Sequence, residues 1–96
     1  MRLKTKSSAR LKKRYLLLHA ENKDIIEKVI LDYIGILGWA RASPLFVDTF
    51  KPLERGKLVL AIDRKELENV RAAIELSKQP IKILKVSGTL NGVLKL

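Results

Sequence analysis

The pattern of apolar and polar positions along the chain predicts four strands and two helices. Four apolar-rich runs have the lengths and flanking turn residues of strands, and they lie at residues 13–21, 43–50, 57–63 and 81–90. Two longer segments repeat apolar residues at helical spacing, and they lie at residues 22–39 and 64–79. The predicted order of elements is therefore β-α-β-β-α-β.

Side chains near the ends of the two helical segments support these limits. Asn22 is a suitable N-cap for the first helix, and Gly35 and Gly38 are expected to loosen or end it. Asp63 and Glu66 form a D-x-x-E pattern that is typical of the start of a helix. Each predicted helix therefore begins at a residue that can cap it.

This order of elements predicts a fold of the α+β class. Right-handed crossovers fold it most simply into a four-stranded antiparallel sheet with both helices on one face, a ferredoxin-like, RRM-like α/β sandwich. Residues 13–96 would form this single domain, with the first and third strands in the centre of the sheet. Apolar residues alternate onto both faces of the third strand, so we expect the N-terminal segment, the chain end or a partner to cover the face away from the helices.

The first predicted helix has an unusually wide apolar surface. Eight of its apolar residues fall within an arc of roughly 180° at helical spacing: Ile25, Ile26, Val29, Ile30, Tyr33, Ile34, Ile36 and Leu37. That arc is wider than one core contact requires, and packing beneath a loop is the alternative explanation. We predict a protein-binding face, whose residues are Ile30, Leu31, Ile34 and Trp39.

Positive charge is concentrated at the start of the chain. The formal net charge is +10, and residues 1–14 hold seven basic side chains and no acidic one. Residues 1–12, called the N-terminal arm below, have too few apolar residues to form a core and are expected to be flexible when free. Such an arm favours a polyanion. A membrane surface is a weaker candidate because the apolar face of an interfacial helix is missing, and a role in solubility alone stays open.

The sequence offers little for catalysis. The single histidine, His19, has no carboxylate or nucleophile fixed beside it in the pattern, and the absence of cysteine removes thiolate metal sites. We therefore predict no catalytic residue, no metal and no cofactor. No apolar run approaches the ~20 residues of a membrane span, so a cytoplasmic location is expected. The third strand carries no aromatic residue and the first only Tyr15, which favours phosphate contacts over base stacking on the sheet.

Four segments in sequence order resemble one known family. They are KKRYLLLHAE, GILGWARASPLFV, DRKELENVRAAIEL and ILKVSGTL, within about residues 10–92. Together they are similar to archaeal ribonuclease P protein component 2, the family shared with the eukaryotic Pop-five and Rpp-fourteen subunits. In the last segment, Gly88 is expected to allow a bend or a close approach of the backbone.

The resemblance implies a subunit of the ribonucleoprotein endonuclease that removes the 5′ leader of precursor tRNA. The RNA of that complex performs the hydrolysis, so the protein would not be catalytic by itself. The implied partners are ribonuclease P RNA, precursor tRNA held by the complex, and the TIM-barrel-like component 3, with a homodimer inside a heterotetramer as one arrangement. Two alternatives stay open: a general or ribosomal-type RNA-binding protein of the same fold, and a protein-interaction module with no role in RNA.

The hypothesis for RNA recognition is neutralisation of phosphates. Fixed cations reduce the repulsion between phosphates and so favour a compact RNA. The candidate RNA-binding residues lie in the N-terminal arm, at the start of the first strand and on the last strand: Lys4, Lys6, Arg10, Lys12, Lys13, Arg14, Lys82 and Lys85.

Overall fold

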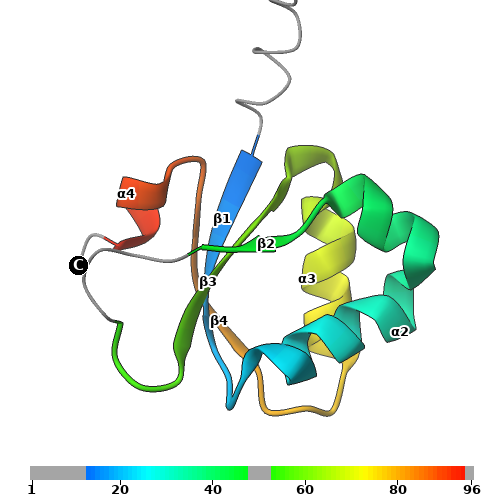
Figure 1. The fold of residues 1–96 in the computed structure, drawn as a ribbon, viewed down its shortest axis with the longest axis horizontal. Coiled ribbons are helices and arrows are strands. Elements are labelled where there is room, and N and C mark those ends of the chain that lie inside the picture. The colour runs from blue at the N-terminus through cyan, green and yellow to red at the C-terminus, as the bar shows by residue number, and fades with distance from the viewer. Residues whose placement is uncertain (1–12, 48–52, 95–96) are drawn as a thin grey trace, which may run out of the picture.

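The structure is a computed structural model that describes residues 13–47 and 53–94. Its helices and strands follow the predicted order, with one additional helix near the chain end (Figure 1). They are β1 (Lys13–His19), α2 (Lys23–Ala42), β2 (Leu45–Phe46), β3 (Lys57–Asp63), the 3-10 helix η1 (Arg64–Glu66), α3 (Leu67–Leu76), β4 (Lys82–Ser87) and α4 (Leu90–Leu94). The predicted N-terminal arm lies outside the described residues.

The four strands form one antiparallel sheet in the order β2-β3-β1-β4. The predicted ferredoxin-like architecture is confirmed, with β1 and β3 in the centre. Pairing between β1 and β4 shifts after Leu17, which is opposite Lys85, whereas Leu18 is opposite Ile83. Leu84 is therefore the extra residue of a bulge, a feature that bends a strand and redirects its side chains.

Helices α2 and α3 cover one face of the sheet (Figure 1). Alternate residues of the central strands point into this layer, and Leu16, Leu18, Leu60 and Ile62 are each fully buried there. The opposing helices contribute buried residues that share a face: Ile26, Val29 and Ile30 of α2, and Val70, Ala73 and Ile74 of α3. The main hydrophobic core thus lies between the sheet and the two helices.

Helix α2 continues past the two glycines that were expected to loosen or end it. The Asn22 side chain accepts a hydrogen bond from the Ile25 amide at 3.1 Å, as expected of an N-cap. Gly35 leaves the helical conformation, with φ 73° and ψ 179°, and the helix then resumes and ends at Ala42. A Cβ on Gly35 would meet no atom within 4 Å, so glycine is favoured there by backbone conformation and not by space.

The second strand is shorter than predicted. Only Leu45 and Phe46 pair with β3, opposite Ala61 and Leu60. The Val47 amide also donates a hydrogen bond to the Val59 carbonyl at 2.9 Å. Residues 48–50 of the predicted strand lie outside the described residues. The expected strand is therefore confirmed as an edge strand, with a two-residue extent in the described chain.

Helix α4 was not predicted, and it lies on the face of the sheet opposite α2 and α3 (Figure 1). It packs against β1 and β4, and its Val93 is buried. The turn before it is held by side chains, because Ser87 Oγ accepts a hydrogen bond from the Thr89 amide and Thr89 Oγ1 accepts one from the Gly92 amide, at 3.3 and 3.0 Å. The second face of the sheet is thus partly covered by the chain itself.

Replacement of Gly92 by alanine is expected to displace α4. A Cβ at this position would overlap Ser87, whose Oγ and Cβ would lie 2.0 and 2.8 Å away. Overpacking of this kind costs about 1–3 kcal/mol, and the cost should appear as a lower free energy of unfolding in urea titrations. Asn91→Ala, at an exposed position of the same helix, is the control, and its free energy of unfolding should be close to that of wild type. Equal stability of Gly92→Ala and wild type would contradict the packing of α4.

Candidate nucleic-acid interface

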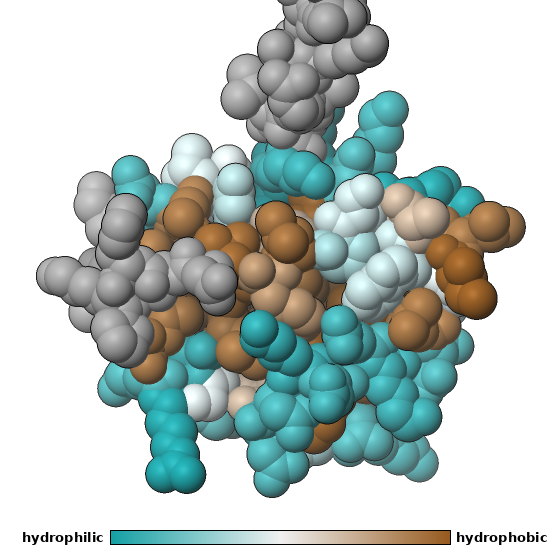
Figure 2. Space-filling view, viewed as in Figure 1, coloured by the Kyte–Doolittle hydropathy of each residue, from teal (hydrophilic) through white to brown (hydrophobic). Residues whose placement is uncertain are grey.

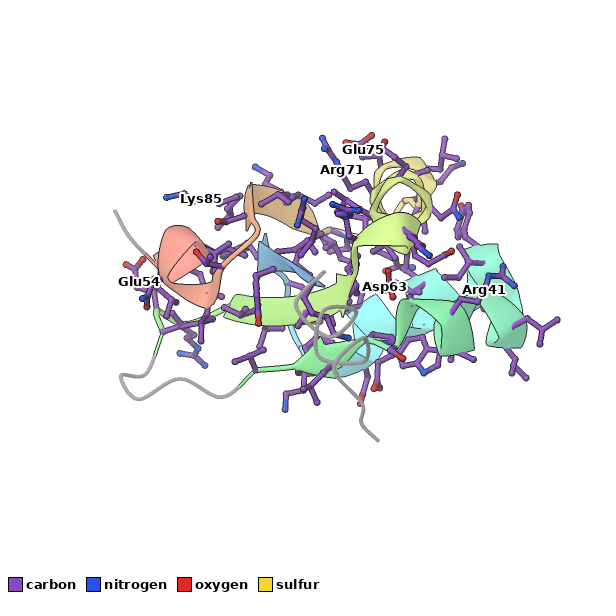
Figure 3. All side chains as sticks on the ribbon, turned by 90° about the horizontal axis from the view of Figure 1, so that it is seen from above. Arg41, Glu54, Asp63, Arg71, Glu75 and Lys85 are labelled. Carbon is purple, nitrogen blue, oxygen red and sulfur yellow. The ribbon has the colours of Figure 1, made fainter. Side chains whose placement is uncertain are left out.

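The described candidate RNA-binding residues occupy opposite ends of the sheet. Lys13 is opposite Asp63 at one end, and Lys82 is opposite His19 at the other. Lys85 lies between them on β4, opposite Leu17, and projects on the α4 side of the sheet (Figure 3). The remaining candidates, Lys4, Lys6, Arg10 and Lys12, lie outside the described residues.

Arg14 lies beside the last core strand rather than free in solvent. Its guanidinium donates a hydrogen bond to the Lys13 carbonyl at 3.0 Å. A Cβ added to Gly88 would lie 3.3 Å from the same guanidinium. Gly88 lies in a bend between β4 and α4, one of the two forms expected there, and the group closest to it is the Arg14 side chain.

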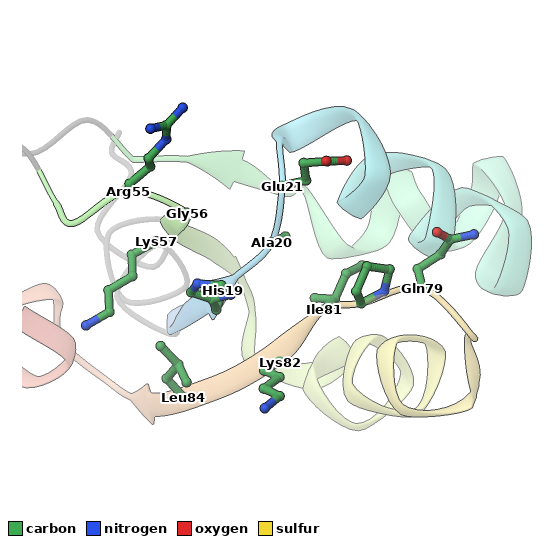
Figure 4. Close-up of a pocket in the computed structure, with 11 residues that line it drawn as sticks. His19, Ala20, Glu21, Arg55, Gly56, Lys57, Gln79, Ile81, Lys82 and Leu84 are labelled. Atoms are coloured by element: carbon green, nitrogen blue, oxygen red, sulfur yellow. The ribbon is translucent and has the colours of Figure 1, made fainter.

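Three neighbouring strands place basic side chains in one row at the end of the sheet. His19 of β1 is opposite Lys57 of β3 and opposite Lys82 of β4. Residues directly opposite in antiparallel strands share a face and lie about 4.5–5.5 Å apart. The row Lys57–His19–Lys82, with Arg55 in the preceding turn (Figure 4), forms what we call the sheet-end cluster.

Lys57 has an ionic partner within this cluster. Its ammonium group donates a hydrogen bond to Glu54 Oε1 at 2.5 Å. This hydrogen bond, together with the positive charge of Lys57, lowers the pKa of the exposed Glu54 carboxyl. Surface ion pairs contribute little to stability, so Lys57 can exchange this carboxylate for another anion at small cost.

Three members of the sheet-end cluster, namely His19, Arg55 and Lys57, were not among the predicted RNA-binding residues. The basic residues on both sides of Gly56 were a usable signal, because a glycine turn before a strand brings its flanking side chains close to the sheet end. The position of His19 between two lysines had no such signal, since it arises from pairing with two distant strands.

The predicted protein-binding residues of α2 are divided between the core and the surface. Ile30 is completely buried, and Ile34 and Trp39 pack partly against the core. Only Leu31, which is 38% exposed, belongs to the large exposed apolar residues. Burial against the domain's own sheet thus accounts for Ile30, and a partner contact has to use other side chains of the helix.

A different set of apolar side chains is exposed around the break at Gly35. We call it the α2 apolar patch, and its residues are Tyr33, Ile36, Leu37 and Leu76. Tyr33 joins the two helices, because its hydroxyl donates a hydrogen bond to the Leu76 carbonyl at 3.2 Å. In Figure 2 apolar surface gathers where α2 turns, at the right of the view. Ile36 and Leu37, 78% and 74% exposed, are the most accessible members.

The described residues lack two other classes of site. In residues 13–47 and 53–94, no group of three or more histidine, cysteine, aspartate or glutamate side chains could hold a metal ion. Within the same ranges, no helix has both the length and the apolar character needed to cross a membrane.

Comparison with known proteins relates the chain to one family. No family model matches it. Curated proteins named ribonuclease P protein component 2 from strains of Methanococcus maripaludis are similar to it. The strain C7 protein is 32% identical over 85 residues, which cover 75% of this chain and 62% of that protein. The strain S2 protein is 33% identical over 95 residues, which cover 85% of this chain and 69% of that protein. The chain therefore spans about two thirds of the length of these relatives.

Proposed function

The chain belongs to the ribonuclease P protein component 2 family, and we propose that it is a protein subunit of ribonuclease P, the ribonucleoprotein that removes the 5′ leader of precursor tRNA. The observation that carries this proposal is the similarity to the strain S2 relative over 85% of the chain. The protein would not cleave RNA by itself. Its role would be to favour the folded, active form of the catalytic RNA.

Phosphate neutralisation is the proposed means of RNA binding. The chain has an excess of ten positive charges, and the described cations at the sheet end lie on one face. Cations fixed by a folded domain reduce phosphate repulsion where RNA segments converge. The N-terminal arm, with five further basic residues, would extend this contact along the RNA.

The α2 apolar patch is the proposed contact for a protein partner. Its residues come from two helices that Tyr33 connects, so the patch belongs to a defined part of the fold. We propose component 3 of the same complex as the protein that covers it, with two such pairs joined through this chain as a heterotetramer. This proposal keeps the predicted helix α2 as the partner-binding element, and it replaces buried Ile30 by exposed Ile36 and Leu37.

Reconstitution tests the proposed function. The purified chain, mixed with ribonuclease P RNA and component 3, should raise the rate of precursor tRNA cleavage at reduced magnesium, because added protein cations substitute for bound metal in folding the RNA. The rate is measured from the appearance of the 5′ leader on gels. The same mixture without this chain is the control. No increase at verified stoichiometry would contradict a role in ribonuclease P.

Deletion of residues 1–12 should reduce the salt dependence of binding to ribonuclease P RNA. If all five basic residues of the arm contact phosphates, the slope of log affinity against log salt should become smaller by about 3–4 units. Filter binding at several potassium concentrations measures the slope. A full-length chain with these five residues changed to glutamine should behave like the deletion. An unchanged slope in both proteins would show that the arm does not bind RNA.

Leu37→Asp should weaken association with component 3. A charge buried in an apolar interface remains without a partner. Loss of a dominant contact costs about 2 kcal/mol or more, so the dissociation constant should rise at least about thirtyfold. Isothermal titration calorimetry measures it. Leu45→Asp is the matched control, since Leu45 is a similarly exposed leucine, 64% against 74%, on the edge strand β2. A larger loss of affinity for Leu45→Asp would indicate that component 3 binds the sheet and not the patch.

A further inference from the structure

An open depression of about 1220 Å³ lies beside the sheet-end cluster. Apolar residues from the end of β1, the α3–β4 loop and β4 contribute to its lining, namely Ala20, Pro80, Ile81 and Leu84. Basic groups accompany them, namely His19, Arg55, Lys57 and Lys82, with Glu21 as the one carboxylate among the lining residues. The depression therefore combines apolar surface with an excess of positive charge.

The bulge in β4 brings an apolar side chain into this depression. Leu84 is the residue without a partner on β1, between Ile83, which packs on the core, and Lys85. It is 45% exposed, and it lies close to His19 in the lining (Figure 4). A bulge commonly redirects a side chain in this way. Leu84 thus offers an apolar contact surface next to cations.

The His19 ring lies against the backbone of the loop before β3. A Cβ added to Gly56 would come within 3.0 Å of His19 Nε2 and 3.4 Å of two ring carbons. Gly56 has φ +86°, and its carbonyl accepts a hydrogen bond from the Ala20 amide at 2.8 Å. The ring is thus supported on one side while the residue stays exposed, which suits it to stack on a planar ligand.

The cations around the depression are available to an anion. Within the described part of the chain, neither Arg55 nor Lys82 takes part in an ion pair. Lys57 is paired with the exposed carboxylate of Glu54. A phosphate can take the place of that carboxylate, because a surface ion pair contributes little to stability. Three cations from a turn and two strands therefore surround apolar surface, an arrangement that complements a negatively charged ligand with planar apolar parts.

Unpaired RNA has this chemistry and duplex RNA does not. In a duplex the bases are stacked inside, so phosphates and sugars meet the protein, and an apolar depression would gain nothing from them. In a single strand the bases can be splayed out to lie on aromatic or apolar side chains while the phosphates contact nearby cations.

We propose that the depression is a subsite for unpaired nucleotides of RNA, with bases against His19 and Leu84 and phosphates on Lys82, Lys57 and Arg55. This inference rests on the proposed function, which supplies the RNA. It changes the expectation that contacts are limited to phosphates, because the bulge and the supported histidine create a stacking surface without the aromatic strand residues of an RRM.

Binding of two labelled RNA probes tests the subsite. The probes are a single-stranded adenosine hexamer and a blunt RNA duplex of twelve base pairs, titrated with the full chain by fluorescence anisotropy at 0.15 M salt. Leu84→Ser removes apolar surface without changing charge, and hexamer affinity should fall about five- to tenfold, whereas duplex affinity should change less than twofold. Leu45→Ser, at an exposed leucine of the edge strand β2, should leave both affinities near wild type.

A second pair of variants tests the phosphate contact. Lys82→Gln should lower the affinity for the hexamer more than Lys65→Gln does. Lys65→Gln removes the same charge from η1, at the other end of β3. Thermal unfolding confirms that each variant is folded. Unchanged hexamer affinity in Leu84→Ser, or equal losses for hexamer and duplex, would overturn the subsite. If these results contradict the subsite while wild-type protein still stimulates tRNA cleavage, the proposed function is retained. If wild-type protein does not stimulate cleavage, the proposed function is wrong whatever the hexamer result.

Discussion

The central position of β1, paired with β3 on one side and β4 on the other, is the constraint on which the rest of this structure depends. Antiparallel pairing fixes which residues share a face, since a shift of one residue would turn every side chain to the other side. Leu16 and Leu18 then enter the core below α2 and α3, and Leu17 and His19 face the opposite way. The apolar core and the sheet-end cluster are consequences of one register.

The two candidate binding surfaces differ in the physical interaction that each offers. The α2 apolar patch presents large exposed side chains, which favour a protein surface that can bury them. The sheet-end cluster presents cations from β3, β4 and the turn before β3, which favour phosphates. The patch lies on α2 and α3, whereas the cluster shares its face with α4 on the other side of the sheet. Protein and RNA partners could therefore be bound together, as the proposed role in a ribonucleoprotein requires.

Local irregularities create both surfaces. Gly35 interrupts α2 with a positive φ, so the residues after it no longer continue the helical phase that buries Ile26 and Ile30. The bulge at Leu84 similarly removes one residue from the alternation of β4. In each case regular periodicity would have directed the apolar side chain differently, and the interruption leaves it on the surface beside groups from another element.

The sequence by itself determined the order of elements, the two faces of β3, the N-cap at Asn22, the break at Gly35 and the excess of positive charge. Each of these depends on residues close together in the chain, through spacing, backbone preference or charge count. Tertiary structure decided that Ile30 is core and Ile36 surface, because the arc of α2 was wide enough to satisfy either arrangement. It also decided the row Lys57–His19–Lys82 and the packing of α4. Both result from contacts between segments far apart in sequence, and local sequence patterns carry no information about such contacts.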